Sequence, residues 1–253
     1  MIAALRRRVA GTDRGSSLTE MLVTMLVFAV ILAATGALTI GFMRTNAQTV
    51  NLQDQVDAGR TAVETMSKTL RTAVMPNQMT TCTPTCNQDA FVVGQNFSVK
   101  FYANINNPGN VIGPSQVTYT VVTSGADKGK LIEKIQVHDP FVGADTNYLY
   151  CDADAVGATA ACKARVKTRV VARGVQVSGP AVFSYYKPGA GSPLTPGASG
   201  LTGTELSSVL AVELSVTVQA GKSNLAAPTT YIQRITLPNA QSVLRKKEEA
   251  ATP

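Results

Sequence analysis

A long uncharged stretch near the N-terminus dominates the pattern of apolar and polar positions. The 23 residues from 21 to 43 carry no charged side chain. A helix of that length extends roughly 34 Å at about 1.5 Å per residue, and the hydrocarbon core of a bilayer is about 30 Å thick. The pattern therefore predicts a helix that spans a membrane.

The next stretch, residues 44–75, has the periodicity of an amphipathic helix. Apolar residues recur at intervals of three, four and seven, which places them on one face. These residues are Leu52, Val56, Val63, Met66, Leu70 and Val74. Pro76 ends the pattern. We therefore expect one helix over residues 17–75, roughly 90 Å long, whose second half packs on a sheet because its apolar face is unstable in water.

After Pro76 the chain contains short runs rich in Val, Thr, Tyr and Phe, which favour strands, with Gly-containing turns between them. The expected strands are 91–102, 116–122, 131–138, 147–150, 166–177, 181–187, 206–219 and 229–237. The predicted fold class is α+β, with one long N-terminal α-helix packed on a mainly antiparallel β-sheet domain. Residues 187–203 are too rich in Gly and Pro for regular structure, so we expect an exposed loop there.

The charge pattern gives the predicted helix a direction. Arg6, Arg7, Arg8 and Arg14 precede the uncharged stretch, and basic residues beside a span stay on the cytoplasmic side. The sequence thus predicts a single-pass membrane protein with an extracytoplasmic C-terminal domain. Its expected parts are a leader (1–15), the two halves of the helix (16–43 and 44–75), a β-rich domain (76–243) and a frayed tail (244–253).

All four cysteines lie after the apolar stretch, on the side where an oxidising compartment lets disulfides persist. Four cysteines allow three pairings, and the sequence cannot choose among them. We favour local pairing, Cys82 with Cys86 and Cys151 with Cys162, because it closes two short loops. Neither pair has the two-residue spacing of a zinc hook or of a Cys-X-X-Cys redox motif. We therefore expect no metal and no cofactor.

A short motif before the apolar stretch adds a resemblance to a known family. Gly15 follows a basic leader and precedes the pentad 16–20 (SSLTE), which ends in Glu20. This arrangement resembles the class III signal of type IV prepilins, and the resemblance covers residues 6–43. In that family a membrane-embedded prepilin peptidase cuts after the glycine, and the fifth mature residue is glutamate. The resemblance implies cleavage between Gly15 and Ser16, N-methylation of Ser16 and a pilin-like fold.

Three residues depart from the family pattern. Ser16 replaces the usual Phe, Thr19 replaces Val or Ile, and Ala37 stands where many major pilins have a helix-kinking proline. These departures favour a minor pilin or a pseudopilin over a major pilin.

The resemblance gives Glu20 a role in assembly. Cleavage would leave Ser16 with a free amine, positive at neutral pH, and an isolated charge among packed helices is costly. In the family, the carboxylate at this position offsets such an amine, so that a wrong axial register buries two unpaired charges. The predicted function is a non-enzymatic filament subunit, held in the membrane and then assembled into a cell-surface filament. Its expected partners are other pilin or pseudopilin subunits, the prepilin peptidase and an inner-membrane assembly platform.

The N-terminus is also compatible with two simpler kinds of targeting segment. A conventional secretory signal would be cut within residues 33–37, which are small. An uncut signal anchor would keep the whole stretch. Either would make the chain a secreted or membrane-anchored protein without a filament.

The sequence shows no catalytic constellation. His138 is the only histidine, and its place at the end of an expected strand favours a capping or solvated role. Asp152 and Asp154 alternate like calcium ligands, but the glycine and glutamate of an EF-hand do not follow. We expect an exposed disulfide loop there and no enzymatic activity.

A basic run provides the alternative function. If the run is a strand, every second residue points to one face, and those residues are Lys163, Arg165, Lys167 and Arg169. Four cations on one face would suit DNA, as in a competence-type pseudopilin that takes up DNA. A solvated outer sheet face, or one that pairs with acidic residues of a neighbouring subunit, accounts for the same pattern. No aromatic residue is interleaved for base stacking.

Overall fold

The computed structural model describes residues 17–79, 89–141, 148–219 and 226–237. The leader (1–15), Ser16, Cys82, Cys86 and the tail (244–253) lie outside these residues. The chain divides into two units, 1–49 and 50–253, and each unit is described by itself.

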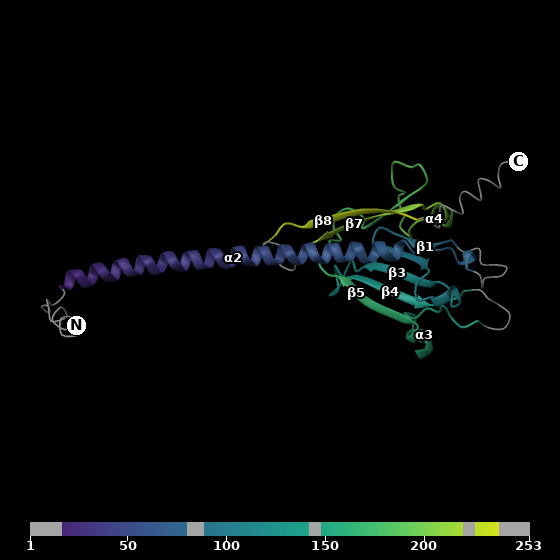
Figure 1. Cartoon of the computed structure of the whole chain (residues 1–253), viewed down its shortest axis with the longest axis horizontal. Coiled ribbons are helices and arrows are strands. Elements are labelled where there is room, and N and C mark those ends of the chain that lie inside the picture. The colour runs from purple at the N-terminus through teal and green to yellow at the C-terminus, as the bar shows by residue number, and fades with distance from the viewer. Residues whose placement is uncertain (1–16, 80–88, 142–147, 220–225, 238–253) are drawn as a thin grey trace, which may run out of the picture. The chain divides into compact units, whose positions relative to one another are not determined.

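The N-terminal stretches form one continuous helix, as expected, labelled α2 (Leu18–Leu70) in Figure 1. This helix ends before residue 75 because the chain joins a sheet early. Ala73 pairs with Ala103 in an antiparallel bridge, and the backbone N–H of Val74 donates to the carbonyl of Tyr102 at 2.9 Å. A short 3₁₀ turn, η1 (Pro76–Gln78), follows.

Five antiparallel strands form the larger sheet, in the order β1-β2-β3-β4-β5. They are β1 (Phe91–Gly94), β2 (Ser98–Ala103), β3 (Ser115–Val121), β4 (Leu131–Val137) and β5 (Val166–Ala172). Side chains alternate between two faces: on β3, Val117 and Tyr119 are buried, whereas Gln116 and Thr118 are half-buried. We call these the inner and the outer face of the sheet.

Three antiparallel strands form a second sheet: β6 (Phe183–Tyr186), β7 (Ala211–Val218) and β8 (Thr229–Thr236). Hydrogen bonds tie β6 to the turn between β1 and β2. The backbone N–H of Phe183 donates to the carbonyl of Asn96 at 3.1 Å, and the hydroxyl of Tyr185 donates to the carbonyl of Gln95 at 3.0 Å. The two sheets are therefore parts of one packed body.

The core of this body forms around the part of α2 that follows Val50. Figure 1 shows β7 and β8 on one side of it and β3, β4 and β5 on the other. The buried residues of α2 are Gln55, Gly59, Ala62, Val63, Met66, Ser67 and Leu70. The apolar ones join a single cluster with inner-face residues such as Phe101 and second-sheet residues such as Leu214. The molecule is thus an α+β protein with one long N-terminal helix and antiparallel sheets.

The expected helix face was only partly right. Val63, Met66, Leu70 and Val74 are buried as predicted, but Leu52 is 46% exposed. The buried face begins only at Gln55 and includes small residues, because two sheets approach the helix closely.

Several expected strands also differ. Residues 91–102 form two strands, because the backbone N–H of Gln95 donates to the carbonyl of Ser98 at 2.8 Å and closes a turn. The strand expected at 166–177 ends at Ala172, shortly before Gly174 takes a positive φ of 75°.

Three further corrections concern short helices and loops. Residues 206–219 begin within a helix, α4 (Gly203–Ser207), which a capping box between Thr202 and Glu205 stabilises. A second short helix, α3 (Ala160–Ala164), was not expected, and residues 148–150 are not a strand. Residues 187–202 contain no helix or strand, as expected, although Leu201 within them is buried.

Candidate functional site

The apolar half of α2 is the first candidate site. Within the described ranges of the chain, α2 is the one helix that is long and apolar enough to cross a membrane. Its apolar side chains lie exposed, for example Leu18 at 84% and Phe42 at 74%. Exposed apolar area of this extent is unstable in water, so this stretch needs lipid or other apolar helices around it.

The polar residues within this half are satisfied by the helix itself. The hydroxyl of Thr24 donates to the carbonyl of Met21 at 2.9 Å, and that of Thr39 donates to the carbonyl of Thr35 at 2.8 Å. Thr35 in turn donates to the carbonyl of Ile31 at 3.0 Å. Such internal bonds remove the cost of placing hydroxyl groups in an apolar surrounding.

Glu20 lies in the first turn of α2. The backbone N–H of Glu20 donates to the hydroxyl of Ser17 at 3.3 Å, and the spacing of Ser17 and Glu20 is that of a capping box. A carboxylate here is also favoured by the helix dipole. Sequence reasoning missed this local role, although the Ser-X-X-Glu spacing carries its signal. The cleavage point, Gly15 and Ser16, lies outside the described residues.

One of the two disulfides expected from local pairing lies within the described residues. Cys151 and Cys162 form a disulfide, with Cys162 buried in α3. The threonine before α3 caps it, because the hydroxyl of Thr159 accepts from the backbone N–H of Cys162 at 3.2 Å. The pairing of Cys82 with Cys86 stays a prediction, since both residues lie outside the described part.

The basic run does not form one strand face, which corrects the expectation. Lys163 lies in α3 and Arg165 follows it as the C-cap, so only Lys167 and Arg169 lie on β5. These two share the inner face with Glu133, because Glu133 is the cross-strand partner of Arg169. The expected outer face is therefore wrong for them, but both side chains are exposed at this edge of the sheet, so the expected solvation is confirmed.

Two of the four cations are engaged by carboxylates. Arg165 donates to Asp139 at 2.6 Å, and both side chains are about one quarter exposed. Arg169 donates through Nε and Nη2 to the buried carboxylate of Glu133. Because these two cations pair with carboxylates, less positive charge is available to a polyanion. DNA binding through this run stays a prediction, and none of the described contacts supports it.

Glu133 is the centre of a buried polar network on the inner face. Its side chain is 2% exposed, and it accepts from the hydroxyl of Tyr119 at 2.5 Å as well as from Arg169. Burial, and then the bond to Glu133, raise the pKa of the Tyr119 phenol. The bond to the carboxylate raises the pKa of the Arg169 guanidinium. The network joins β3, β4 and β5 and gives a buried charge the partners that it requires.

His138 makes structural contacts. Nδ1 lies 2.5 Å from the carbonyl of Asp139, and Nε2 lies 2.5 Å from the carbonyl of Ile112. Its ring stacks on Phe141 with centroids 4.9 Å apart. In the described part of the chain no three His, Cys, Asp or Glu residues come together as metal ligands would.

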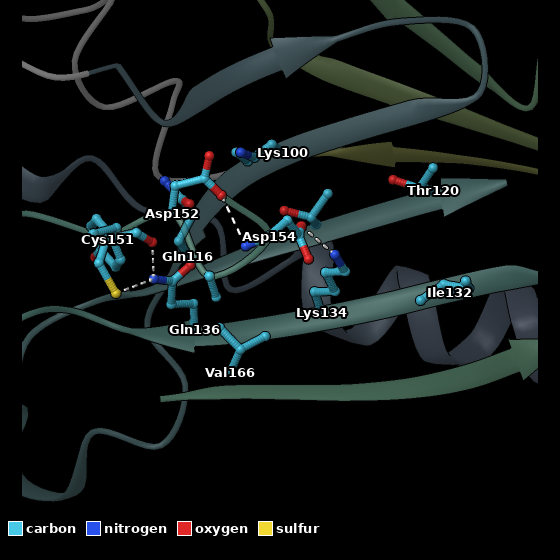
Figure 2. Close-up of a pocket in the computed structure, with 13 residues that line it drawn as sticks. Lys100, Gln116, Thr120, Ile132, Lys134, Gln136, Cys151, Asp152, Asp154 and Val166 are labelled. Atoms are coloured by element: carbon cyan, nitrogen blue, oxygen red, sulfur yellow. Dashed lines mark hydrogen bonds and ion pairs between the residues drawn. The ribbon is translucent and has the colours of Figure 1, made fainter. Parts of the chain in front are cut away.

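A polar hollow on the outer face is a site that sequence reasoning missed. It has a volume of about 520 Å³, with β2, β3 and β4 as its floor and the loop of Cys151, Asp152 and Asp154 as its wall (Figure 2). We call it the outer groove. The alternation of polar residues on the strands was its only signal in the sequence, because the loop reaches it through tertiary structure alone.

The chain was compared with protein-family models, with characterised proteins and with solved structures, and none of the three comparisons found a match.

Proposed function

We propose that this chain is a non-enzymatic structural subunit, a minor pilin or pseudopilin, of a type IV pilus or a related filament. The apolar half of α2 would hold it in the membrane before assembly and would then pack against helices of other subunits. The globular β domain would lie on the extracytoplasmic side and then on the filament surface.

One observation carries this proposal: a single helix, α2, begins at Leu18 beside Glu20 and continues into the core of the β domain. A cleavable secretory signal would be removed and would have no reason to continue into a folded domain. One half of this helix is apolar and would lie in the membrane before assembly. The other half packs in the core of the β domain, so the two parts stay on one mature chain.

The first experiment identifies the mature N-terminus. Mass spectrometry of the native protein should give a chain that begins at Ser16, and a methyl group there would add support. A chain that begins near Ala37 would show conventional secretion, and an intact leader would show a signal anchor. Either of these two results would end the filament proposal.

The second experiment separates the two roles of Glu20. The variant Glu20→Gln keeps a side chain that suits a capping box but removes the charge, whereas Ser17→Ala removes the capping hydroxyl and keeps the charge. If the charge sets the filament register, Glu20→Gln should be cleaved normally yet be lost from the sheared filament fraction. Ser17→Ala should still assemble. Normal assembly of Glu20→Gln would contradict the register role.

A further inference from the structure

The outer groove contains a regular row of donor groups. Lys100 on β2 is paired with Thr118 on β3, and Thr118 is paired with Lys134 on β4. Residues directly opposite on antiparallel strands have Cβ atoms about 5 Å apart. The row therefore places one hydroxyl between two ammonium groups on the floor of the groove.

Neutral polar groups lie beside this row. In the neighbouring row, Gln116 is the cross-strand partner of Gln136, and both line the groove. Their amides add neutral hydrogen-bonding groups beside the charges, although the NH2 group of Gln136 already donates to Cys151. The floor thus suits a ligand that carries several hydrogen-bonding groups around a negative charge.

The positive charge of the row is only partly neutralised. Lys134 pairs with Asp154 at 2.5 Å, and the Asp154 carboxylate is 77% exposed. Among the described residues no ion pair involves Lys100. With Asp152 and Asp154 on the wall, the lining carries as many carboxylates as ammonium groups. Lys100 is not bonded to either carboxylate, so an anionic group on the ligand can approach it without breaking an ion pair.

The wall of the groove is held in place. The disulfide between Cys151 and Cys162 closes the loop, and the amide of Gln136 donates to the carbonyl of Cys151 at 2.6 Å. Within the loop, the backbone N–H of Asp154 donates to Oδ1 of Asp152 at 3.0 Å. Figure 2 shows both aspartates beside the strands, with Asp154 bonded to Lys134, so the wall places acceptors next to the donors of the floor. A fixed wall reduces the ordering cost of binding.

From this arrangement we propose that the outer groove binds an acidic saccharide. The carboxylate of a uronic acid unit would lie at Lys100, and its hydroxyl groups would bond to Thr118 and Asp152. A simple anion would use the lysine alone and leave the acceptors of the wall without a role. The proposal does not depend on filament assembly, because the groove lies entirely within the β domain.

A titration of the labelled full-length protein in detergent, followed by nuclear magnetic resonance, tests this proposal. The probe is trigalacturonate, and the comparison ligands are neutral maltotriose and inorganic phosphate. We expect saturable shifts at the groove with a dissociation constant of about 1 mM or tighter, weakened by salt. Absence of saturable shifts with trigalacturonate, or equal affinity for maltotriose or phosphate, would overturn the proposal.

A pair of matched variants tests the role of Lys100. Lys100→Gln should weaken trigalacturonate binding about tenfold, as expected for loss of a charge-assisted hydrogen bond. Lys128→Gln removes the same charge from an exposed turn outside the groove and should bind like the native protein. Unchanged thermal unfolding of both variants controls for folding. Equal affinity of the two variants would place the ligand elsewhere and reject the assignment.

Discussion

Gly59 lies where Tyr231 of β8 packs against α2. A Cβ atom at this position would come 2.5 Å from Cδ2 of Tyr231, a distance that real contacts do not reach. Glycine in a helix ordinarily lowers stability by about 1 kcal/mol relative to alanine. Here the missing side chain allows an aromatic ring from the second sheet to pack directly on the helix backbone.

We predict that Gly59→Ala destabilises the protein, although alanine is the better helix former. The ring of Tyr231 must move, and overpacking of this kind costs about 1–3 kcal/mol. Chemical denaturation of the full-length protein in detergent measures the change. Gly203→Ala is the control, because a Cβ there meets nothing within 4 Å. Equal or higher stability of Gly59→Ala would contradict the close packing.

At the scale of elements, the edge strand β5 is attached by more than its ladder. Arg169 reaches from β5 to the buried Glu133 of β4, and Tyr119 of β3 bonds to the same carboxylate. The two partners differ in exposure, since the Arg169 side chain is 60% exposed and that of Glu133 is 2% exposed. The cost of breaking the pair therefore depends on which partner is removed.

We predict that Arg169→Ala is more destabilising than Glu133→Gln. The first variant leaves a buried carboxylate without its cation, which costs about 2–4 kcal/mol. The second leaves an arginine that water can solvate and an amide that can still bond to Tyr119.

Denaturation of both variants, together with hydrogen exchange of β5, measures the difference. The matched control is Arg60→Ala, which breaks the exposed pair with Glu64 on α2 and should change stability little. A larger loss for Glu133→Gln than for Arg169→Ala would show that the carboxylate, and not its cation, dominates the network.

At the scale of the folded β domain, several tyrosine side chains are buried or half-buried. Burial raises the pKa of the phenols of Tyr102, Tyr119, Tyr150 and Tyr185. Three of these residues lie on β2, β3 and β6, and Tyr150 directly precedes Cys151, so together they report on most of the domain. The chain contains no tryptophan and seven tyrosines, which makes tyrosine absorbance a clean measure of its folding.

We predict that the folded protein loses stability as the pH rises above about 10, the ordinary tyrosine pKa. In this range the unfolded chain releases phenol protons that the folded chain keeps, so the folded state binds more protons and stability falls with pH. An absorbance titration should show only part of the seven tyrosines ionising before unfolding.

The control is the same protein in denaturant, in which all tyrosines should ionise near pH 10, at about their ordinary pKa. Complete ionisation in the folded protein near that pH, without unfolding, would contradict the burial of these phenols.

The sequence by itself determined the helix and the order of strands that follows it. The uncharged stretch and the spacing of Val63, Met66 and Leu70 depend only on residues close together in the chain, so local pattern was enough. The same applies to the capping bond between Ser17 and Glu20, whose Ser-X-X-Glu spacing was readable but overlooked. Strand boundaries were predicted less accurately because they depend on pairing with distant segments of the chain.

Only the tertiary structure decided which residues meet across strands. It placed Arg169 on Glu133, which the alternation of cations along the chain did not suggest, and it brought Asp154 to Lys134 above the outer face. Register and edge position come from pairing between distant segments, and one residue of register reverses the face of every side chain on a strand. Local periodicity contains no information about those long-range pairings.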